Sequence, residues 1–386
     1  MTSADTSAVH AGRDDLAAQG LVIPPIDLSS TYPLHDIDRG GDSYENLTGG
    51  GDLVVGESPV YQRLWSPTVS RFEDAMATLE HADGAVAFAS GMAAIAAVLQ
   101  AAVAAGTPHI VAVRPLYGGT DALLSAGILG TRVTWAEADR VAEALQPDTG
   151  LVHVETPANP TLELVDIAAV VKQSGAVPVS VDSTFATPVL QNPLDLGASL
   201  SIHSATKYIG GHSDVVAGVV AAKGDWLARL RSIRALTGAI LHPEAGYLVH
   251  RGLQTLPVRI RAAQEGARKL AAWLAEQPEV AEVYHPEAPG RDPLGLIGTQ
   301  MRGPGAMVSF ALAGGYDQAA QVASGVRLIK HAVSLGGIES LIQHPAALTH
   351  RPVPPEARPA ASVLRLSVGL EDPDDLIADL TRALRP

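Results

Sequence analysis

The fold of this chain is decided by the stretch Ser201-Ile-His-Ser-Ala-Thr-Lys-Tyr-Ile-Gly-Gly-His-Ser-Asp214, which sets one lysine among small hydroxyl residues. Little room remains beside Lys207 for a carboxylate partner, which favours an amine with a lowered pKa that attacks carbonyl groups. The hydroxyl groups of Ser204 and Thr206 are able to hold a phosphate from the same segment. Taken alone, the stretch fits a surface turn equally well, so the residues upstream decide between the two interpretations.

A short β-branched strand is predicted at 177–181, and Asp182 stands where it ends. The carboxyl ends of parallel strands are where open α/β sheets bind ligands. Pyridoxal phosphate requires a buried anion against its pyridine nitrogen, which keeps the ring electron-withdrawing. The alternative for Asp182 is a turn cap, since Ser183 and Thr184 follow it. Its pairing with Lys207 favours the cofactor site over the cap.

Two further segments add candidate cofactor contacts. Ala85-Val-Ala-Phe-Ala-Ser-Gly-Met92 reads as a strand and turn that run into a helix, so the N–H groups of Gly91 and Met92 would face an anion. Leu116-Tyr-Gly-Gly-Thr120 follows another predicted strand, and Tyr117 is placed to stack on an aromatic cofactor. The chain contains neither a P-loop nor G-x-G-x-x-G, which argues against a nicotinamide dehydrogenase.

The order of these motifs resembles the cysteine/methionine-metabolism family of pyridoxal-phosphate enzymes: cystathionine γ-synthase, cystathionine γ-lyase and methionine γ-lyase. The resemblance runs from Ala8-Val-His-Ala-Gly12 through Pro24-Pro-Ile-Asp-Leu-Ser-Ser-Thr-Tyr32 to Leu366-Ser-Val-Gly-Leu-Glu371. Its most specific matches are 201–211 and Ser334-Leu-Gly-Gly-Ile-Glu-Ser-Leu-Ile-Gln-His-Pro345. It implies the aminotransferase-like α/β fold (fold type I), with a mainly parallel sheet in a large domain and a smaller α+β C-terminal domain.

The resemblance also implies roles in a cofactor site. Lys207 would carry the cofactor and transfer protons, Asp182 would hold the pyridinium proton, and Tyr117 would stack on the ring and protonate the leaving group. Tyr61 and Arg63 match a phosphate-binding pair that a neighbouring subunit donates, which implies a homotetramer built from two catalytic dimers. The other expected phosphate contacts are Gly91, Met92, Ser204 and Thr206.

The same resemblance implies a substrate pocket. Arg365 matches the arginine that binds the α-carboxylate of the amino acid, and Ser334 would line the same pocket. Asn159 matches a residue near the cofactor's phenolic oxygen and the substrate carboxylate. Val333 stands where cystathionine enzymes typically carry glutamate, and it suits an apolar thioether tail, as in methionine γ-lyases.

The implied reaction is γ-elimination on a sulfur amino acid, giving an α-keto acid, ammonia and a thiol. Two positions depart from methionine γ-lyases: Gly119 replaces a usual cysteine, and Arg234-Ala235 replaces Lys-Asp. The alternative is therefore γ-replacement or cystathionine cleavage, as in cystathionine γ-synthase and cystathionine γ-lyase. A distant alternative, a non-catalytic binding protein with this fold, is opposed by the intact Lys207 and Asp182.

Composition sets further limits. With 386 residues the chain is long enough for two cores, and we expect an N-terminal arm at 1–62 that contributes to a neighbouring subunit. The large cofactor-binding domain is predicted at 63–257 and the small C-terminal domain at 258–386. Within the arm, the polar, glycine-rich stretch 38–52 predicts a loop that is longer than the family pattern.

The net charge and the absence of cysteine exclude several classes of binding partner and of metal site. The net charge of −14 argues against a nucleic-acid or anionic-membrane surface, so a small amino acid is the expected ligand. The chain has no cysteine, so disulfides and thiolate metal sites are excluded. His203 and His212 are interpreted as structural, and no metal site is predicted. The first residues lack the features of a signal peptide, which makes the cytoplasm the expected location.

Overall fold

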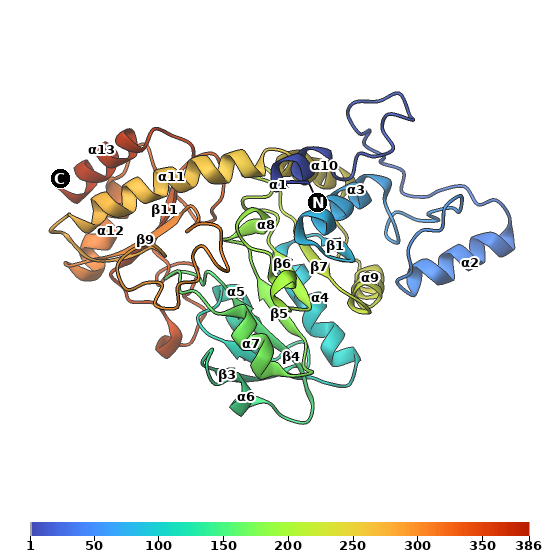
Figure 1. The fold of residues 1–386 in the computed structure, drawn as a ribbon, viewed down its shortest axis with the longest axis horizontal. Helices are drawn as coiled ribbons and strands as arrows, with labels where there is room; N and C mark the ends of the chain where they lie inside the picture. The colour runs from blue at the N-terminus through green and yellow to red at the C-terminus, as the bar shows by residue number, and fades with distance from the viewer. Residues whose placement is uncertain (1, 386) are drawn as a thin grey trace.

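A computed structural model describes residues 2–385 and places them around two β-sheets (Figure 1). The first sheet has seven strands in the order β1-β7-β6-β5-β4-β2-β3. Strands β6, β5, β4, β2 and β3 run parallel, whereas β7 is antiparallel to both β1 and β6. The strands are β1 Gly84–Phe88, β2 His109–Val113, β3 Arg132–Ala136, β4 Thr149–Glu155, β5 Val179–Asp182, β6 Leu200–His203 and β7 Gly218–Ala222.

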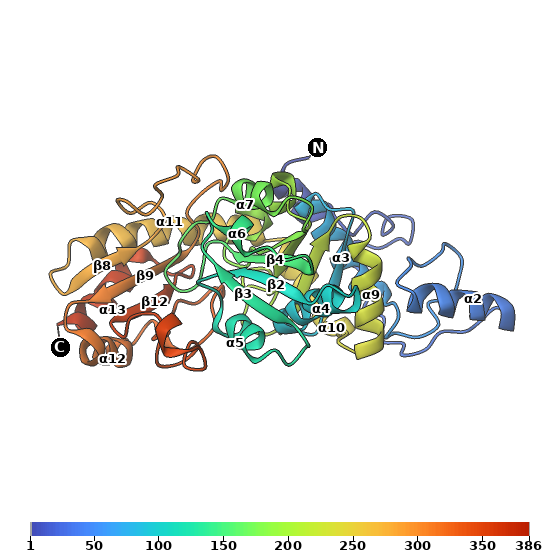
Figure 2. The same cartoon turned by 90° about the horizontal axis from the view of Figure 1, so that it is seen from below.

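Helices cover both faces of this sheet, which is why every residue of β2, β4, β5 and β6 is buried, including polar ones such as His153 and Ser180. Figure 2 shows α6 and α7 on one side of β4, β2 and β3, and α4 and α5 on the other. The helices of this part are α3 Pro67–Glu80, α4 Gly91–Ala104, α5 Gly118–Ala126, α6 Val141–Ala144, α7 Ile167–Ser174, α8 Thr187–Leu190, α9 Trp226–Thr237 and α10 Pro243–Leu253, with a 3₁₀ turn η1 at Pro193–Leu196.

The second sheet has five strands in the order β10-β11-β12-β9-β8 and is antiparallel except for the β10–β11 pair. Its strands are β8 Val280–Tyr284, β9 Met307–Leu312, β10 Lys330–His331, β11 Leu341–Gln343 and β12 Val363–Ser367. Helices α11 Leu256–Ala275, α12 Gly315–Gly325 and α13 Pro373–Leu384 pack against it, and a 3₁₀ turn, η2, lies at Pro355–Ala357. In Figure 1, α11 runs from the first sheet to the second.

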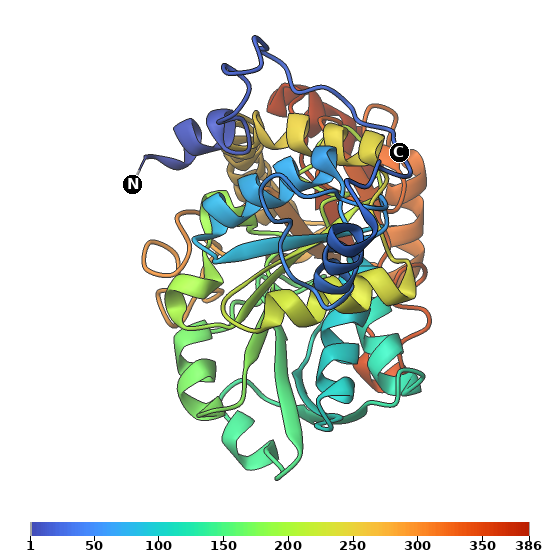
Figure 3. The ribbon, with the colours of Figure 1, turned by 90° about the vertical axis from the view of Figure 1, so that its right-hand side faces the viewer.

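The N-terminal segment contains α1 Ala4–His10 and α2 Ile37–Thr48, and α2 projects beyond the rest of the molecule beside α9 (Figures 1 and 3). The prediction of a loop across 38–52 is therefore wrong for most of that range. Asp36 caps the helix by accepting a hydrogen bond from the Arg39 N–H at 2.8 Å. Leu47 is buried with Leu64 and Ala235, and this small apolar cluster outweighs the low helix propensity of the glycines.

From their apolar or alternating patterns, the sequence predicts strands at 110–113, 151–154, 307–312 and 364–368 and one that begins at Val215. The first four correspond to β2, β4, β9 and β12. The strand predicted from Val215 begins later, at Gly218, because the backbone of Ala217 bonds to Thr206 in the lysine turn. The proposed domain limits at 62 and 257 stay predictions. Between residues 2 and 385 no helix is both long and apolar enough to cross a membrane.

Candidate active site

A cavity of about 510 Å³ lies where the carboxyl ends of β4, β5 and β6 meet the second sheet. Ligands bind at this edge in open α/β sheets. Most of the residues that the sequence singles out line it together, although they are spread over more than half of the chain. They are Gly91, Met92, Tyr117, Asn159, Asp182, Ser204, Thr206, Lys207, Val333, Ser334 and Arg365.

The predicted nucleophile lies in the turn that follows β6. The Lys207 Nζ donates a hydrogen bond to the Ser334 Oγ at 2.7 Å. Burial lowers the pKa of Lys207 to about 8, and the nearby charge of Arg365 lowers it further in the same direction. An amine whose pKa lies this close to neutrality is partly unprotonated at physiological pH, as a carbonyl-attacking lysine requires.

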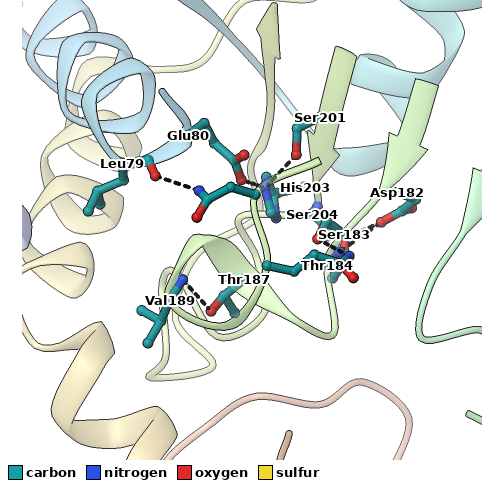
Figure 4. Close-up of polar contacts among 12 residues, drawn as sticks. Leu79, Glu80, Asp182, Ser183, Thr184, Thr187, Val189, Ser201, His203 and Ser204 are labelled. Atoms are coloured by element: carbon teal, nitrogen blue, oxygen red, sulfur yellow. Dashed lines mark hydrogen bonds and ion pairs between the residues drawn. The ribbon is translucent and has the colours of Figure 1, made fainter. Parts of the chain in front are cut away.

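The predicted pyridine partner is the last residue of β5. The Asp182 Oδ1 accepts hydrogen bonds from the Thr184 N–H at 3.0 Å and from its hydroxyl at 2.6 Å (Figure 4). The Thr184 Oγ1 also accepts from the Ser204 N–H at 2.9 Å, which ties the carboxylate to the lysine turn. Asp182 therefore caps a turn and faces the cavity at once, so the two interpretations of this residue do not exclude each other.

The start of α4 lies against the lysine turn at the cavity. The Ser90 Oγ accepts from the Ala93 N–H at 3.1 Å, which leaves the N–H groups of Gly91 and Met92 at a helix N-terminus. A Cβ at Gly91 would lie only 2.8 Å from the Ser204 Cβ, so glycine is required for this close approach. The Thr206 hydroxyl already donates to the Ala217 carbonyl at 3.1 Å, so it would have to leave this partner to donate to a phosphate.

Arg365 is brought from β12 of the second sheet and is buried. Its Nη1 donates to the Asn159 Oδ1 at 2.8 Å and its Nη2 to the Ser334 carbonyl at 3.0 Å. Burial lowers the pKa of Arg365 to about 10, which leaves the guanidinium charged at neutral pH. Ser334 has a φ of 89°, in the left-handed region that favours glycine, so the bonds from Arg365 and Lys207 hold a strained residue. Val333 is exposed at the rim of the cavity.

Glu155 is a member of the site to which the sequence assigned no role. It ends β4 in register with Asp182, and only 5% of it is exposed. Its Oε2 accepts from the Tyr117 N–H at 2.6 Å and its Oε1 from the Asn159 N–H at 3.0 Å. Burial raises the pKa of Glu155 well above its usual value, and the charge of Asp182 acts in the same direction. The sequence signal that could have identified Glu155 is a carboxylate at the end of a buried strand, the same signal that identified Asp182.

Four other predicted positions lie elsewhere in the part of the chain described here. Tyr61 and Arg63 are not among the residues that line this cavity in residues 2–385. The Arg63 guanidinium lies 5.5 Å from the centre of the Tyr61 ring and donates to the Ala235 carbonyl. His203 lies 2.5 Å from the buried Glu80 carboxylate (Figure 4), and the His212 ring contacts its neighbouring Gly210 carbonyl at 2.9 Å. Neither histidine contact involves a residue that lines the cavity, which agrees with a structural role for both histidines.

The cavity fits pyridoxal phosphate. The lysine turn offers an amine with a lowered pKa, β5 offers a buried carboxylate and α4 offers backbone donors for a phosphate. The ring of Tyr117, which is 39% exposed, lies at the same cavity. These are the groups that the aldehyde, the pyridine nitrogen, the phosphate and the ring face of the cofactor require.

Comparisons with known proteins agree with this chemistry. A family model described as "Cys/Met metabolism PLP-dependent enzyme" matches residues 5–385. An L-methionine γ-lyase of Brevibacterium sandarakinum is 59% identical, with 98% of this chain and 97% of the relative covered. One of Streptomyces avermitilis is 54% identical, with 98% and 88% covered. A cystathionine γ-synthase structure from Xanthomonas oryzae pv. oryzae has a TM-score of 0.89 and 37% identity, with 100% and 98% covered.

Proposed function

The chain belongs to the Cys/Met metabolism PLP-dependent enzymes, and from this premise we propose that it eliminates the γ substituent of L-methionine or a similar thioether amino acid. The predicted family, fold class and cofactor are thereby confirmed. The observation that supports the substrate is the exposed aliphatic side chain of Val333 beside Ser334, with Val216 and Leu348 also lining the cavity. An apolar wall there favours a thioether tail without a charged end.

Each residue has a role in this proposal. Pyridoxal phosphate, when bound, supplies an electron sink for charge that develops on the α and β carbons of the substrate. Lys207 would remove and return protons at these two carbons, because its amine titrates near neutrality. Asp182 would hold the proton of the ring nitrogen. Arg365 would bind the substrate carboxylate as a fixed cation, and Tyr117 would protonate the departing sulfur.

The proposed assembly is a homotetramer of two catalytic dimers. Tyr61 and Arg63 are separated from the cavity of their own chain, and the rim residues Tyr117 and Val216 are exposed. Both observations support donation of the Tyr61–Arg63 pair to a neighbouring subunit. The proposed compartment is the cytoplasm, since a chain without cysteine makes no use of an oxidising environment.

Mixing two inactive variants tests the shared site. R63A and K207A each remove one half of it, so neither homomeric protein should turn over substrate. After unfolding and refolding together in equal amounts, half of the dimers should be hybrids with one complete site, and about a quarter of the wild-type activity should return. One variant carries an affinity tag, so that co-purification of the untagged variant reports the hybrids. If activity stays absent although hybrids are recovered, Arg63 does not serve the neighbouring cavity.

The reaction is tested by incubating purified, cofactor-loaded protein with L-methionine alone. We expect α-ketobutyrate and methanethiol in equal amounts, with K207A as the inactive control. The second candidate, γ-replacement or cystathionine cleavage, is favoured by Gly119 and Arg234-Ala235, which depart from methionine γ-lyases. If the protein does not turn over L-methionine but does turn over L-cystathionine, or O-acyl-homoserine plus cysteine, the second candidate is established and the proposal is refuted.

A further inference from the structure

Glu155 contacts two parts of the site with one carboxyl group. One oxygen accepts the backbone N–H of Tyr117, at the start of α5, at 2.6 Å. The other accepts the backbone N–H of Asn159, in the loop after β4, at 3.0 Å. Asn159 in turn accepts from Arg365 through its side chain. A single buried group therefore connects the residue at the ring face with the residues around the predicted carboxylate site.

The surroundings of this carboxyl group are unusual for a residue with a purely structural role. Asp182 is its register partner on β5, so two carboxyl groups end adjacent parallel strands at the cavity. Burial and the charge of Asp182 raise the pKa of Glu155 and favour its neutral acid, whereas the N–H groups of Tyr117 and Asn159 and the charge of Arg365 favour the carboxylate. A neutral Glu155 would leave Asp182 as the anion that faces the cofactor nitrogen.

Glu73 provides a comparison elsewhere in the same protein. It is similarly buried, its Oε1 accepts the Ala87 N–H at 2.7 Å, and it pairs with Arg234. It does not line the cavity, so it shows what a buried glutamate does for the fold alone. Glu155 differs because both of its backbone partners line the cavity themselves.

We infer that Glu155 is a positioning residue that fixes Tyr117 against the cofactor ring and, through Asn159, fixes Arg365 for the substrate carboxylate. This inference rests on the proposed function of the cavity. Glu155 has no direct role in bond breaking. One carboxyl group thus positions both Tyr117 at the cofactor ring and Arg365 at the substrate carboxylate. A change at Glu155 should therefore disturb cofactor binding and substrate binding together.

The substitution E155Q tests this coupling. A glutamine amide has one acceptor oxygen, so either the Tyr117 or the Asn159 N–H must face an NH₂ group and lose its bond. Loss of one buried hydrogen bond predicts about a tenfold change in the equilibrium that depends on it. We therefore expect the dissociation constant for pyridoxal phosphate and the KM for L-methionine both to rise, about tenfold for the one that depends on the lost bond, with an altered circular dichroism band of the bound cofactor.

The matched control is E73Q, which should lower thermal stability and leave the cofactor band, the cofactor affinity and the KM unchanged. E155D is the second variant, since it keeps the carboxyl group but withdraws it by one methylene and should show the same pattern as E155Q. Unfolding temperatures of all three variants separate the site effect from a stability effect. The inference is overturned if E155Q and E155D lose only stability, as E73Q does.

The cofactor readouts keep this test separate from the reaction. If the wild-type protein binds pyridoxal phosphate but fails to cleave methionine, the proposed function is wrong, and the cofactor affinity and dichroism of E155Q still decide the role of Glu155. If methionine is cleaved and E155Q binds the cofactor with wild-type affinity, dichroism and KM, the proposed function stands and the positioning role is refuted.

Discussion

Replacing Lys207 by methionine should stabilise the cofactor-free protein at neutral pH, and this advantage should shrink as the pH rises. The pKa of Lys207 falls from 10.5 in a free side chain to about 8 in the folded protein, chiefly through burial. At 1.36 kcal/mol for each pKa unit, this difference costs the folded state about 3 kcal/mol at pH 7. Methionine has a similar length and no charge, so it removes this cost.

The direction of the pH effect follows from proton binding. Well below pH 8 the lysine is protonated in both the folded and the unfolded protein, and the whole destabilisation is present. Between pH 8 and pH 10.5 the unfolded chain binds a proton that the folded chain does not, so the stability of the wild type rises with pH. From pH 7 to pH 9 the wild type should gain about 1 kcal/mol relative to K207M.

The assay is urea unfolding of both cofactor-free proteins at pH 7 and pH 9, at one protein concentration because assembly also contributes to stability. K207M loses the bond to Ser334, but that loss changes little with pH and cancels in the comparison. If the free-energy difference between the two proteins is the same at both pH values, the amine is not held at a lowered pKa. The explanation that burial keeps the Lys207 amine partly unprotonated, and so reactive, would then be wrong.

Four other substitutions have defined outcomes. R365K should raise the KM for L-methionine about 10- to 100-fold in steady-state assays, because a lysine cannot reproduce the paired donors of a buried guanidinium; an unchanged KM would remove Arg365 from the carboxylate site. V333E should lower turnover of L-methionine and raise that of L-cystathionine in parallel product assays, since a carboxylate at the rim favours a charged substrate tail. L47A should cost about 2 kcal/mol or more in urea unfolding and expose 37–57 to protease, because Leu47 is buried in the cluster that holds α2; intact resistance would contradict that packing. E80A should lower the free energy of unfolding by about 3 kcal/mol, since it leaves His203 buried without its partner; a loss below 1 kcal/mol, on the scale of an exposed pair, would show that the pair contributes little.

The parts of the fold that the sequence predicts well are those with strong local signals. The β-branched and apolar residues of β2 and of the centre of β4 predict buried strands in a chain where strands and helices alternate. Asp182 can be placed because it ends a predicted strand, and it is paired with Lys207 because the cofactor requires both an anion and an amine. The lysine turn and the end of β5 then lie together as a consequence of sheet order.

The parts that the sequence does not predict depend on contacts between distant residues. Helix α2 is rich in polar residues and glycine, and its stability comes from Leu47 packing on Leu64 and Ala235, which no local pattern reveals. The role of Glu155 requires two backbone N–H groups from different loops to converge on it. The Thr206 hydroxyl is engaged with the strand beyond it, which a motif that names only residue types cannot show.

The two sheets contribute different groups to the cavity. Lys207 and Asp182 come from the first sheet, whereas Val333, Ser334 and Arg365 come from the second. We therefore expect mutations at Val333, rather than at Ser334, whose hydroxyl accepts the Lys207 bond, to alter which amino acid is accepted while the cofactor stays in place. A duplicated gene for such a protein keeps its basic chemistry while it explores new specificities. Because the two sheets supply different groups, substrate specificity in this architecture can evolve separately from cofactor binding.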